Sequence, residues 1–306
     1  MKTRFLTGII LALILVPILV FNQLFPLFEV LGVIFVILAA IEMLNMFSKK
    51  KPIGLLVRVA TIFFTLMIYY SAISIADSER NLMFDMIFRA SNRAFAAVIM
   101  GCLLTLFTLM VFKQDFEGSD VGHSLTTMNY VGLGIASLMV LRLEGLEFII
   151  FALLIPIATD VFAYLFGVKF GRHKMAPNIS PKKSWEGAIA GTFFAIVLGT
   201  IFAYFYGSIF EDGFRTIFGN PEKFGEFGEL ARILQLVIIV FVTFAASVIG
   251  QIGDLVASKL KRTYDIKDFG TIFPGHGGVL DRFDSVIFVS LFLVIVFTFI
   301  RYMLII

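Results

Sequence analysis

The sequence predicts an all-α polytopic integral membrane protein, with about nine transmembrane helices and a polar cavity at the cytoplasmic face. Of its 306 residues, 59% are hydrophobic and 15% are charged, whereas a soluble domain is roughly half apolar and about a quarter charged. The apolar runs are continuous, which indicates helices, because the strands of a membrane barrel alternate in polarity. Its one cysteine, Cys102, excludes an internal disulfide and a cysteine-based zinc site.

Nine apolar runs approach the roughly 20 residues that a helix needs to cross a bilayer. They cover residues 5–21, 24–46, 53–76, 95–112, 124–141, 147–166, 185–206, 231–256 and 284–305. The first run follows a basic start and also resembles a signal peptide. We favour a retained helix, because no small-residue cleavage site follows the run.

The order of the runs divides the chain into three regions. Residues 1–94 hold spans one to three, residues 95–166 hold spans four to six, and residues 167–306 hold the last three spans. The third region also contains two polar loops, at 167–184 and 258–283, which are unlike ordinary connectors because both are rich in glycine, proline and charge.

Lysine and arginine residues predict the orientation. With nine spans, 16 of the 25 fall on the side of the N-terminus, 8 fall on the other side, and Arg58 lies inside the third span. The cytoplasmic side of a membrane protein carries the excess. We therefore expect a multi-pass protein of the plasma membrane. Its N-terminus and both polar loops would be cytoplasmic and its C-terminus outside.

The loop at 258–283 has the composition of a phosphate-binding segment. Its cations, which can hold polyanions, are Lys261, Arg262, Lys267 and Arg282. Its glycines, which would let backbone N–H groups form a nest around phosphate oxygens, are Gly275, Gly277 and Gly278. Asp281 and Asp284 follow at a spacing of three, so they share a face of a helix that begins there. Carboxylates beside phosphates indicate Mg²⁺.

The eighth run carries a polar stripe at helical spacing, formed by Ser247, Gln251, Asp254 and Ser258. A bare carboxylate at the centre of a membrane helix costs about 2.5–3.5 kcal/mol on insertion scales. Asp254 must therefore be paired, protonated or bound to a metal. A structural hydrogen-bonding role is the alternative to a functional one.

Two lysines stand immediately before the seventh run. Lys182, Lys183 and Ser184 would lie at the N-terminus of a helix, a position that favours an anion. A topological anchor with Trp185 at the interface explains the lysines equally well. Asp160, in the sixth run, would face the same cavity.

These residues resemble two motifs of the phosphatidate cytidylyltransferase (CDP-diacylglycerol synthase) family. The first motif reads Ser258, Lys261-Arg262, Lys267-Asp268, His276-Gly277-Gly278 and Asp281-Arg282-Phe283-Asp284. The second is Ser180-Pro-Lys-Lys-Ser-Trp-Glu-Gly187, in which Ser184 keeps the hydroxyl of the usual threonine. Outside about 160–284, the resemblance rests on hydropathy and on the stretch 42–51.

The resemblance implies a dimeric nucleotidyltransferase of phospholipid biosynthesis, which acts on CTP and phosphatidic acid and has no nucleic-acid partner. It implies Mg²⁺, with K⁺ allowed beside it, on Asp254 and Asp281, and we add Asp284 as a further metal ligand. The expected catalytic residues are Asp254, Asp281, Lys261 and Arg282. The expected substrate-binding residues are Asp160, Lys182, Lys183, Ser184, Ser258, Arg262, Lys267, Asp268, His276, Gly277 and Gly278.

Two other activities remain as alternatives. CTP-dependent kinases of long-chain alcohols share a similar Pro-Gly-His-Gly-Gly loop, but the segment 180–187 favours the cytidylyltransferase. An anion transporter would show inverted repeats and interrupted helices at the midplane. The sequence has neither feature.

Two isolated charges remain in the N-terminal region. Glu42 and Arg58 would lie about 10 Å below the cytoplasmic face on consecutive helices, at 1.5 Å per residue. We predict that they pair with each other, with separate snorkelling to the headgroups as the alternative.

Overall fold

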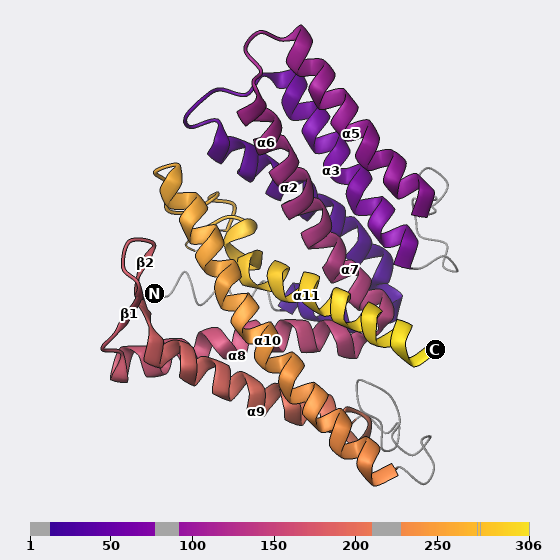
Figure 1. Cartoon of the computed structure of the whole chain (residues 1–306), viewed down its shortest axis with the longest axis vertical. Helices are drawn as coiled ribbons and strands as arrows, with labels where there is room; N and C mark the ends of the chain where they lie inside the picture. The colour runs from indigo at the N-terminus through magenta and orange to yellow at the C-terminus, as the bar shows by residue number, and fades with distance from the viewer. Residues whose placement is uncertain (1–12, 77–91, 210–227, 274, 276, 306) are drawn as a thin grey trace. The chain divides into compact units, whose positions relative to one another are not determined.

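The computed structural model describes residues 13–76, 92–209, 228–273, 275 and 277–305 (Figure 1). Helices dominate these residues, which confirms the predicted all-α class. The chain forms two compact units. Unit 1 consists of Met1–Leu143 and Leu260–Phe283, and unit 2 consists of Glu144–Lys259 and Asp284–Ile306.

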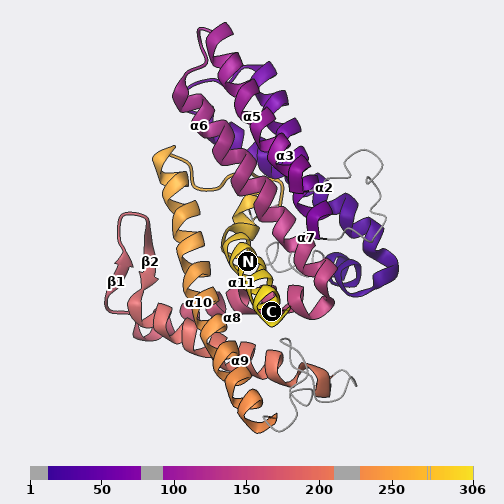
Figure 2. The same ribbon diagram turned by 45° about the vertical axis from the view of Figure 1, so that its right-hand side comes forward.

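Unit 1 is a bundle whose long helices lie side by side (Figures 1 and 2). Its elements are the 3-10 helix η1 (Asn22–Leu24), α2 (Phe25–Phe47), α3 (Leu55–Ala76), α5 (Asn92–Phe112), α6 (Gly118–Thr127), the π-helix η2 (Met128–Leu133) and α7 (Gly134–Glu144). Pro26 lies in the first turn of α2, where its missing N–H costs nothing. At the start of α6, Glu117 and Asp120 form a reciprocal capping box.

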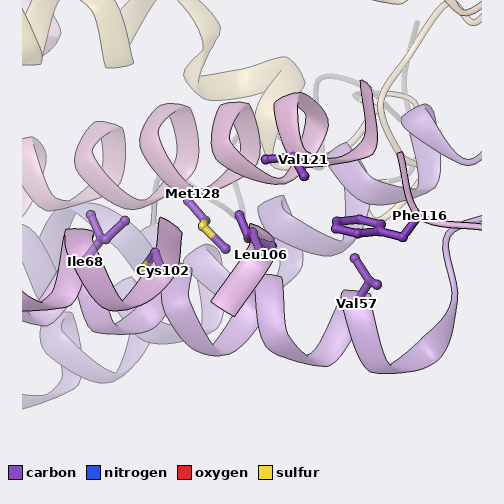
Figure 3. Close-up of a cluster of buried hydrophobic side chains, with 7 residues drawn as sticks. All are labelled: Val57, Ile68, Cys102, Leu106, Phe116, Val121 and Met128. Atoms are coloured by element: carbon purple, nitrogen blue, oxygen red, sulfur yellow. The ribbon is translucent and has the colours of Figure 1, made fainter. Parts of the chain in front are cut away.

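A buried apolar cluster holds the helices of unit 1 together (Figure 3). It joins α3, α5, α6 and η2, and its members are Val57, Ile68, Cys102, Leu106, Phe116, Val121 and Met128. Because Cys102 is one of them, its thiol serves as an apolar packing group.

Unit 2 is built on two helices packed along their lengths, α8 (Leu146–Phe170) and α9 (Trp185–Ile209). Glycine allows this close approach, since a Cβ atom on Gly191 would lie 2.5 Å from the carbonyl oxygen of Thr159. The unit also contains most of α10 (Gly228–Thr263) and of α11 (Leu280–Ile305).

The segment predicted as the loop 167–184 contains a β-hairpin. Strand β1 (Lys174–Ala176) pairs antiparallel with β2 (Ser180–Ser184), and the hairpin leads from α8 to α9 (Figures 1 and 2). Helix α8 also continues to Phe170, beyond the predicted end of the sixth run. The two strands are three and five residues long and contain lysine and proline, so the sequence did not predict them.

Among the described residues, eight helices are long and apolar enough to cross a membrane. They match the predicted runs from the second to the ninth. The first run, 5–21, lies partly outside the described residues. Within the part of this run that is described, residues 13–20 are helical. The count of nine therefore stays a prediction.

The helices beside the last loop are longer than their apolar runs. Helix α10 extends to Thr263 instead of ending at 256, because a helix can continue through charged residues once it has left the apolar layer. Helix α11 starts at Leu280 instead of 284. Side-chain carboxylates accept the backbone N–H groups at this end, which lets the helix start earlier.

Candidate active site

The candidate site residues fall in both units, and each group has its own geometry. Unit 1 holds Lys261, Arg262, Lys267, Asp268, Gly277, Gly278, Asp281 and Arg282. Unit 2 holds Asp160, Lys182, Lys183, Ser184, Asp254, Ser258 and Asp284. His276 lies outside the described residues.

Asp281 is the organising centre of the group in unit 1. Its Oδ1 accepts a hydrogen bond of 2.7 Å from Lys261 Nζ. Its Oδ2 accepts from the backbone N–H groups of Phe269 at 2.7 Å and Gly278 at 2.9 Å. The Asp281 side chain is only 3% exposed. The carboxylate thus joins the two ends of the segment 269–278 to the last turn of α10.

Glycine is required where this segment passes Asp281. Gly277 has a φ of +84°, which L side chains rarely adopt. A Cβ atom on Gly277 would also lie 2.7 Å from Asp281 Oδ2. The predicted phosphate nest is wrong for Gly278, because its N–H group already donates to Asp281.

Three cations that flank the segment 269–278 are exposed, namely Arg262, Lys267 and Arg282. Arg262 Nη1 donates to the carbonyl oxygen of Ile266 at 3.2 Å, which tightens the turn after α10. Tyr264 fixes the same turn, because its hydroxyl lies 2.8 Å from His123 Nε2 on α6. Burial raises the pKa of the Tyr264 hydroxyl above its ordinary value. Exposed cations beside a fixed turn can hold a polyanion.

Glu42, in α2, belongs to the same group although it is far away in sequence. Its Oε1 accepts from Val279 N at 2.9 Å and its Oε2 accepts from Leu280 N at 3.0 Å. Glu42 is 4% exposed. It therefore caps the start of α11.

The predicted pair between Glu42 and Arg58 is wrong. Arg58 donates instead to Asn45 Oδ1 and Ser48 Oγ, both at 2.7 Å, and to the carbonyl oxygen of Ile53 at 3.2 Å. It thereby closes the turn between α2 and α3. Backbone N–H groups satisfy the Glu42 carboxylate, and polar groups of the nearby turn satisfy the Arg58 guanidinium, so the two side chains do not pair.

In unit 2, a cavity of about 250 Å³ joins α8, α9, α10 and the hairpin. Its polar lining includes Asp160, Lys182, Lys183, Ser184 and Gln251. The structure thus brings the predicted lysine pair and Asp160 to one cavity, as the sequence predicted.

Asp254 forms an ion pair with Lys183 beside this group. The two side chains are 25% and 26% exposed, respectively. Ser258 Oγ lies 3.5 Å from Asp254 Oδ1, at the limit of a hydrogen bond. Asp254 is therefore paired with a cation, which is one of the three states predicted for a carboxylate in a membrane helix, namely paired, protonated or bound to a metal.

The rest of the predicted polar stripe on α10 packs against α8 and α9. Ser247 Oγ lies 2.8 Å from Thr159 Oγ1 and 3.2 Å from Thr192 Oγ1. Gln251 Nε2 donates to Thr192 Oγ1 at 2.8 Å. This network satisfies polar groups that would otherwise be costly in an apolar layer. Both threonines interrupt apolar runs in the sequence, but neither was predicted as a site residue.

Local hydrogen bonds hold the hairpin beside the cavity. Glu186 accepts from the backbone N–H groups of Arg172 and His173, and its Oε1 lies 2.6 Å from His173 Nδ1. Ser184 Oγ accepts from Gly187 N at 3.3 Å and so caps α9. Because α9 begins at Trp185, the two lysines do precede a helix N-terminus as predicted.

An apolar groove of about 350 Å³ adjoins the lysine-lined cavity. Its lining includes Trp185, Ile189, Phe193, Phe244 and Ile252. The groove and the lysine-lined cavity share Met175, Ala188 and Gln251. Unit 2 therefore offers two lysines beside an apolar surface, which together suit an amphipathic molecule.

Comparisons with known proteins identify the family. A family model described as "Cytidylyltransferase family" matches residues 2–300. The chain belongs to this family. It is 32% identical over 291 residues to the phosphatidate cytidylyltransferase of Staphylococcus haemolyticus (strain JCSC1435), which covers 94% of this chain and 96% of that protein. It is 34% identical over 192 residues to that of Staphylococcus aureus (strain COL), which covers 63% of this chain and 64% of that protein.

Mg²⁺ stays a prediction, and the carboxylates fit it unequally. Asp254 is partly exposed, and its partner Lys183 is a side chain that can move away. Asp281 has about four acceptor positions, and three of them are filled by Lys261 and two backbone groups. Asp284 Oδ1 accepts from Ser285 N at 2.8 Å. Hard carboxylate oxygens suit Mg²⁺, so Asp254 is the carboxylate whose surroundings best fit a metal.

The described residues contain no group of three or more His, Cys, Asp or Glu side chains that could hold a metal ion. A metal at Asp254 would thus need oxygen atoms from elsewhere, for which substrate phosphates are the natural source in Mg²⁺ sites.

Proposed function

We propose that this member of the cytidylyltransferase family transfers the cytidylyl group of CTP to phosphatidic acid, which yields CDP-diacylglycerol and pyrophosphate. The observation that carries the proposal is the junction in unit 2 between a lysine-lined cavity and an apolar groove. Phosphatidic acid has the matching shape, since a phosphate is attached to two acyl chains.

The reaction needs positioning and charge neutralisation more than acid–base chemistry. A phosphate oxygen of phosphatidic acid attacks the α-phosphorus of CTP, a new P–O bond forms, and the bond to the β-phosphate breaks as pyrophosphate leaves. The nucleophile is already anionic, so no strong general base is required. Fixed cations can then supply most of the catalysis.

We assign the lipid headgroup to Lys182 and Lys183, and the acyl chains to the groove beside Trp185 and Phe193. The apolar groove lets the lipid bind without leaving the bilayer, which would expose both acyl chains to water. We assign the polyphosphate of CTP to the exposed Arg262, Lys267 and Arg282. Lys261 is held by Asp281 and supports the segment that carries Arg282.

We propose Mg²⁺ as the cofactor, held by Asp254, while Asp281, Asp284 and an accompanying K⁺ stay predictions. When bound, Mg²⁺ supplies positive charge that neutralises phosphate oxygens as charge develops. Lys183 pairs with Asp254 and would help to hold the substrate phosphate beside such a metal.

The activity is tested with the full chain, purified in mixed micelles with phosphatidic acid. CTP labelled in the cytosine ring should transfer its label to the lipid and release pyrophosphate. A kinase of long-chain alcohols would instead move the γ-phosphate to phytol or dolichol and release CDP. Label in CDP with none in lipid would overturn the proposal.

We further propose that the protein lies in the plasma membrane, with its N-terminus and the segments 171–184 and 264–279 in the cytoplasm and its C-terminus outside. Asn178 and Thr271 are exposed, so Asn178→Cys and Thr271→Cys can be made one at a time in a Cys102→Ala background. Impermeant thiol reagents should label either position only after the membrane is opened. Labelling in intact cells would reverse the orientation.

A homodimer is the expected assembly. Cross-linking in native membranes, followed by mass measurement of the purified protein in detergent, tests this state. A protein that remains monomeric in both experiments would contradict it.

A further inference from the structure

We infer that Glu42 is a positioning residue for the cytidylyl transfer, because its carboxylate fixes the start of α11 and thereby the placement of Asp281 and Arg282. The inference rests on the proposed function for its catalytic readout. The carboxylate is far from these residues in sequence, since Val279 follows Glu42 by 237 positions.

Three consecutive backbone N–H groups point to this conclusion. Those of Gly278, Val279 and Leu280 lie at the N-terminus of α11, where helices commonly bind anions. Here the protein fills the position with its own carboxylates. Gly278 donates to Asp281, and the next two residues donate to Glu42. A substrate phosphate has no access to these donors while both carboxylates stay in place.

Glycines on both sides of Glu42 bring the segment close to it. A Cβ atom on Gly270 or on Gly278 would collide with the Glu42 carboxyl group. Gly270 follows Phe269, whose N–H group donates to Asp281. The two carboxylates therefore hold both ends of the segment 269–280, one from α2 and one from α11 itself.

This arrangement explains how an exposed arginine can be placed accurately. Arg282 is exposed, but it lies two residues after Leu280 and its N–H group donates to the carbonyl oxygen of Val279 at 3.0 Å. Both Val279 and Leu280 are bound to Glu42. A shift of the Glu42 carboxylate would therefore move the backbone that carries Arg282.

The test compares Glu42→Gln with Met43→Ala, a change of a fully buried neighbour on the same helix. The glutamine amide can accept from one of the two N–H groups, but it presents its own NH₂ group to the other. We expect kcat/KM to fall about 100-fold, as for a small misplacement of reacting groups. Amide exchange in the peptide 277–283 should also accelerate. Met43→Ala should lower the Tm at least as much, but keep near-normal kcat/KM and exchange.

The inference is overturned if Glu42→Gln keeps the wild-type kcat/KM and the wild-type amide exchange of the peptide 277–283. It is also overturned if Glu42→Gln and Met43→Ala lose kcat/KM and exchange protection equally, when each variant is measured at the same number of degrees below its own Tm. If Glu42→Gln does not fold, Glu42→Asp serves instead, because it keeps the charge but withdraws it by one methylene. Amide exchange needs no turnover. A wild-type protein that does not form CDP-diacylglycerol would count against the proposed function, and exchange would still decide whether Glu42 holds α11.

Discussion

Asp254 in unit 2 and Asp281 in unit 1 each form an ion pair with a lysine, but their other partners differ. Asp254 contacts the side chains of Lys183 and Ser258 and is 25% exposed. Asp281 is 3% exposed and accepts two backbone hydrogen bonds in addition to that of Lys261. The first carboxylate can exchange partners by side-chain rotation. The second can do so only if the backbone moves.

This difference indicates different roles for the two carboxylates. A carboxylate with mobile partners suits a ligand that enters and leaves during turnover. A carboxylate bound to backbone groups suits the maintenance of one loop conformation. The expected effects of substitution therefore differ in stability more than in activity.

Asp281→Asn should have the largest effect, because it removes the acceptor that organises the segment 269–278. Breaking a buried ion pair costs about 3–5 kcal/mol, so we expect the Tm in detergent to fall steeply. Turnover should also drop, by about 10³-fold. Thermal unfolding and initial rates with CTP and phosphatidic acid measure the two effects. A variant with a normal Tm would contradict the organising role.

Asp254→Asn should reduce turnover about as much, by about 10³-fold, but leave the Tm nearly unchanged. The side chain is partly exposed, and surface-like ion pairs contribute about 0–1 kcal/mol. The variant should also lose its response to Mg²⁺ concentration. Normal turnover at saturating Mg²⁺ would exclude Asp254 from metal binding.

The sequence predicted those features that depend on local spacing. Continuous apolar runs located the helices, and the spacing of Ser247, Gln251 and Asp254 located a polar face that the structure confirms on α10. The lysine pair before α9 was also recognised. Each of these features follows from the period of one helix or from one short segment.

The features that the sequence did not reveal depend on contacts between distant segments. Glu42 was noticed as an isolated acid, but its partners are backbone groups 237 and 238 residues away. Backbone N–H groups have no residue-specific signature, so a neighbouring arginine was the wrong choice. The glycines Gly275, Gly277 and Gly278 predicted a nest for phosphate, but not that one of the protein's own carboxylates, Asp281, would accept from the N–H group of Gly278.

Lys183→Ala should have a moderate effect that separates the two lysines of the cavity. Lys183 pairs with Asp254, whereas Lys182 lines the cavity without that ion pair. Loss of a charged hydrogen bond of about 1.5–3 kcal/mol predicts a fall in kcat/KM of about 10- to 100-fold. Wild-type KM should rise with ionic strength, and the rise should be smaller in the variant.

Lys182→Ala is the matched control for this change. It should alter KM for phosphatidic acid but leave the Mg²⁺ response unchanged. If both variants kept wild-type kcat/KM, the pair would serve only as a topological anchor.

Gly277→Ala should have the smallest effect on activity, and it probes the backbone side of the comparison. The left-handed conformation costs an alanine about 1–2 kcal/mol, and the new Cβ atom would meet Asp281 Oδ2 at 2.7 Å. We expect a destabilisation of about 2 kcal/mol and a modest loss of activity. Gly101→Ala in α5 is the control, since a Cβ atom there meets nothing within 4 Å. That change should stabilise the helix by about 0.5–1 kcal/mol. Opposite signs in thermal unfolding would show that the Asp281 loop depends on its backbone conformation, whereas equal effects would mean that the loop relaxes and that Asp281 is no more constrained than Asp254.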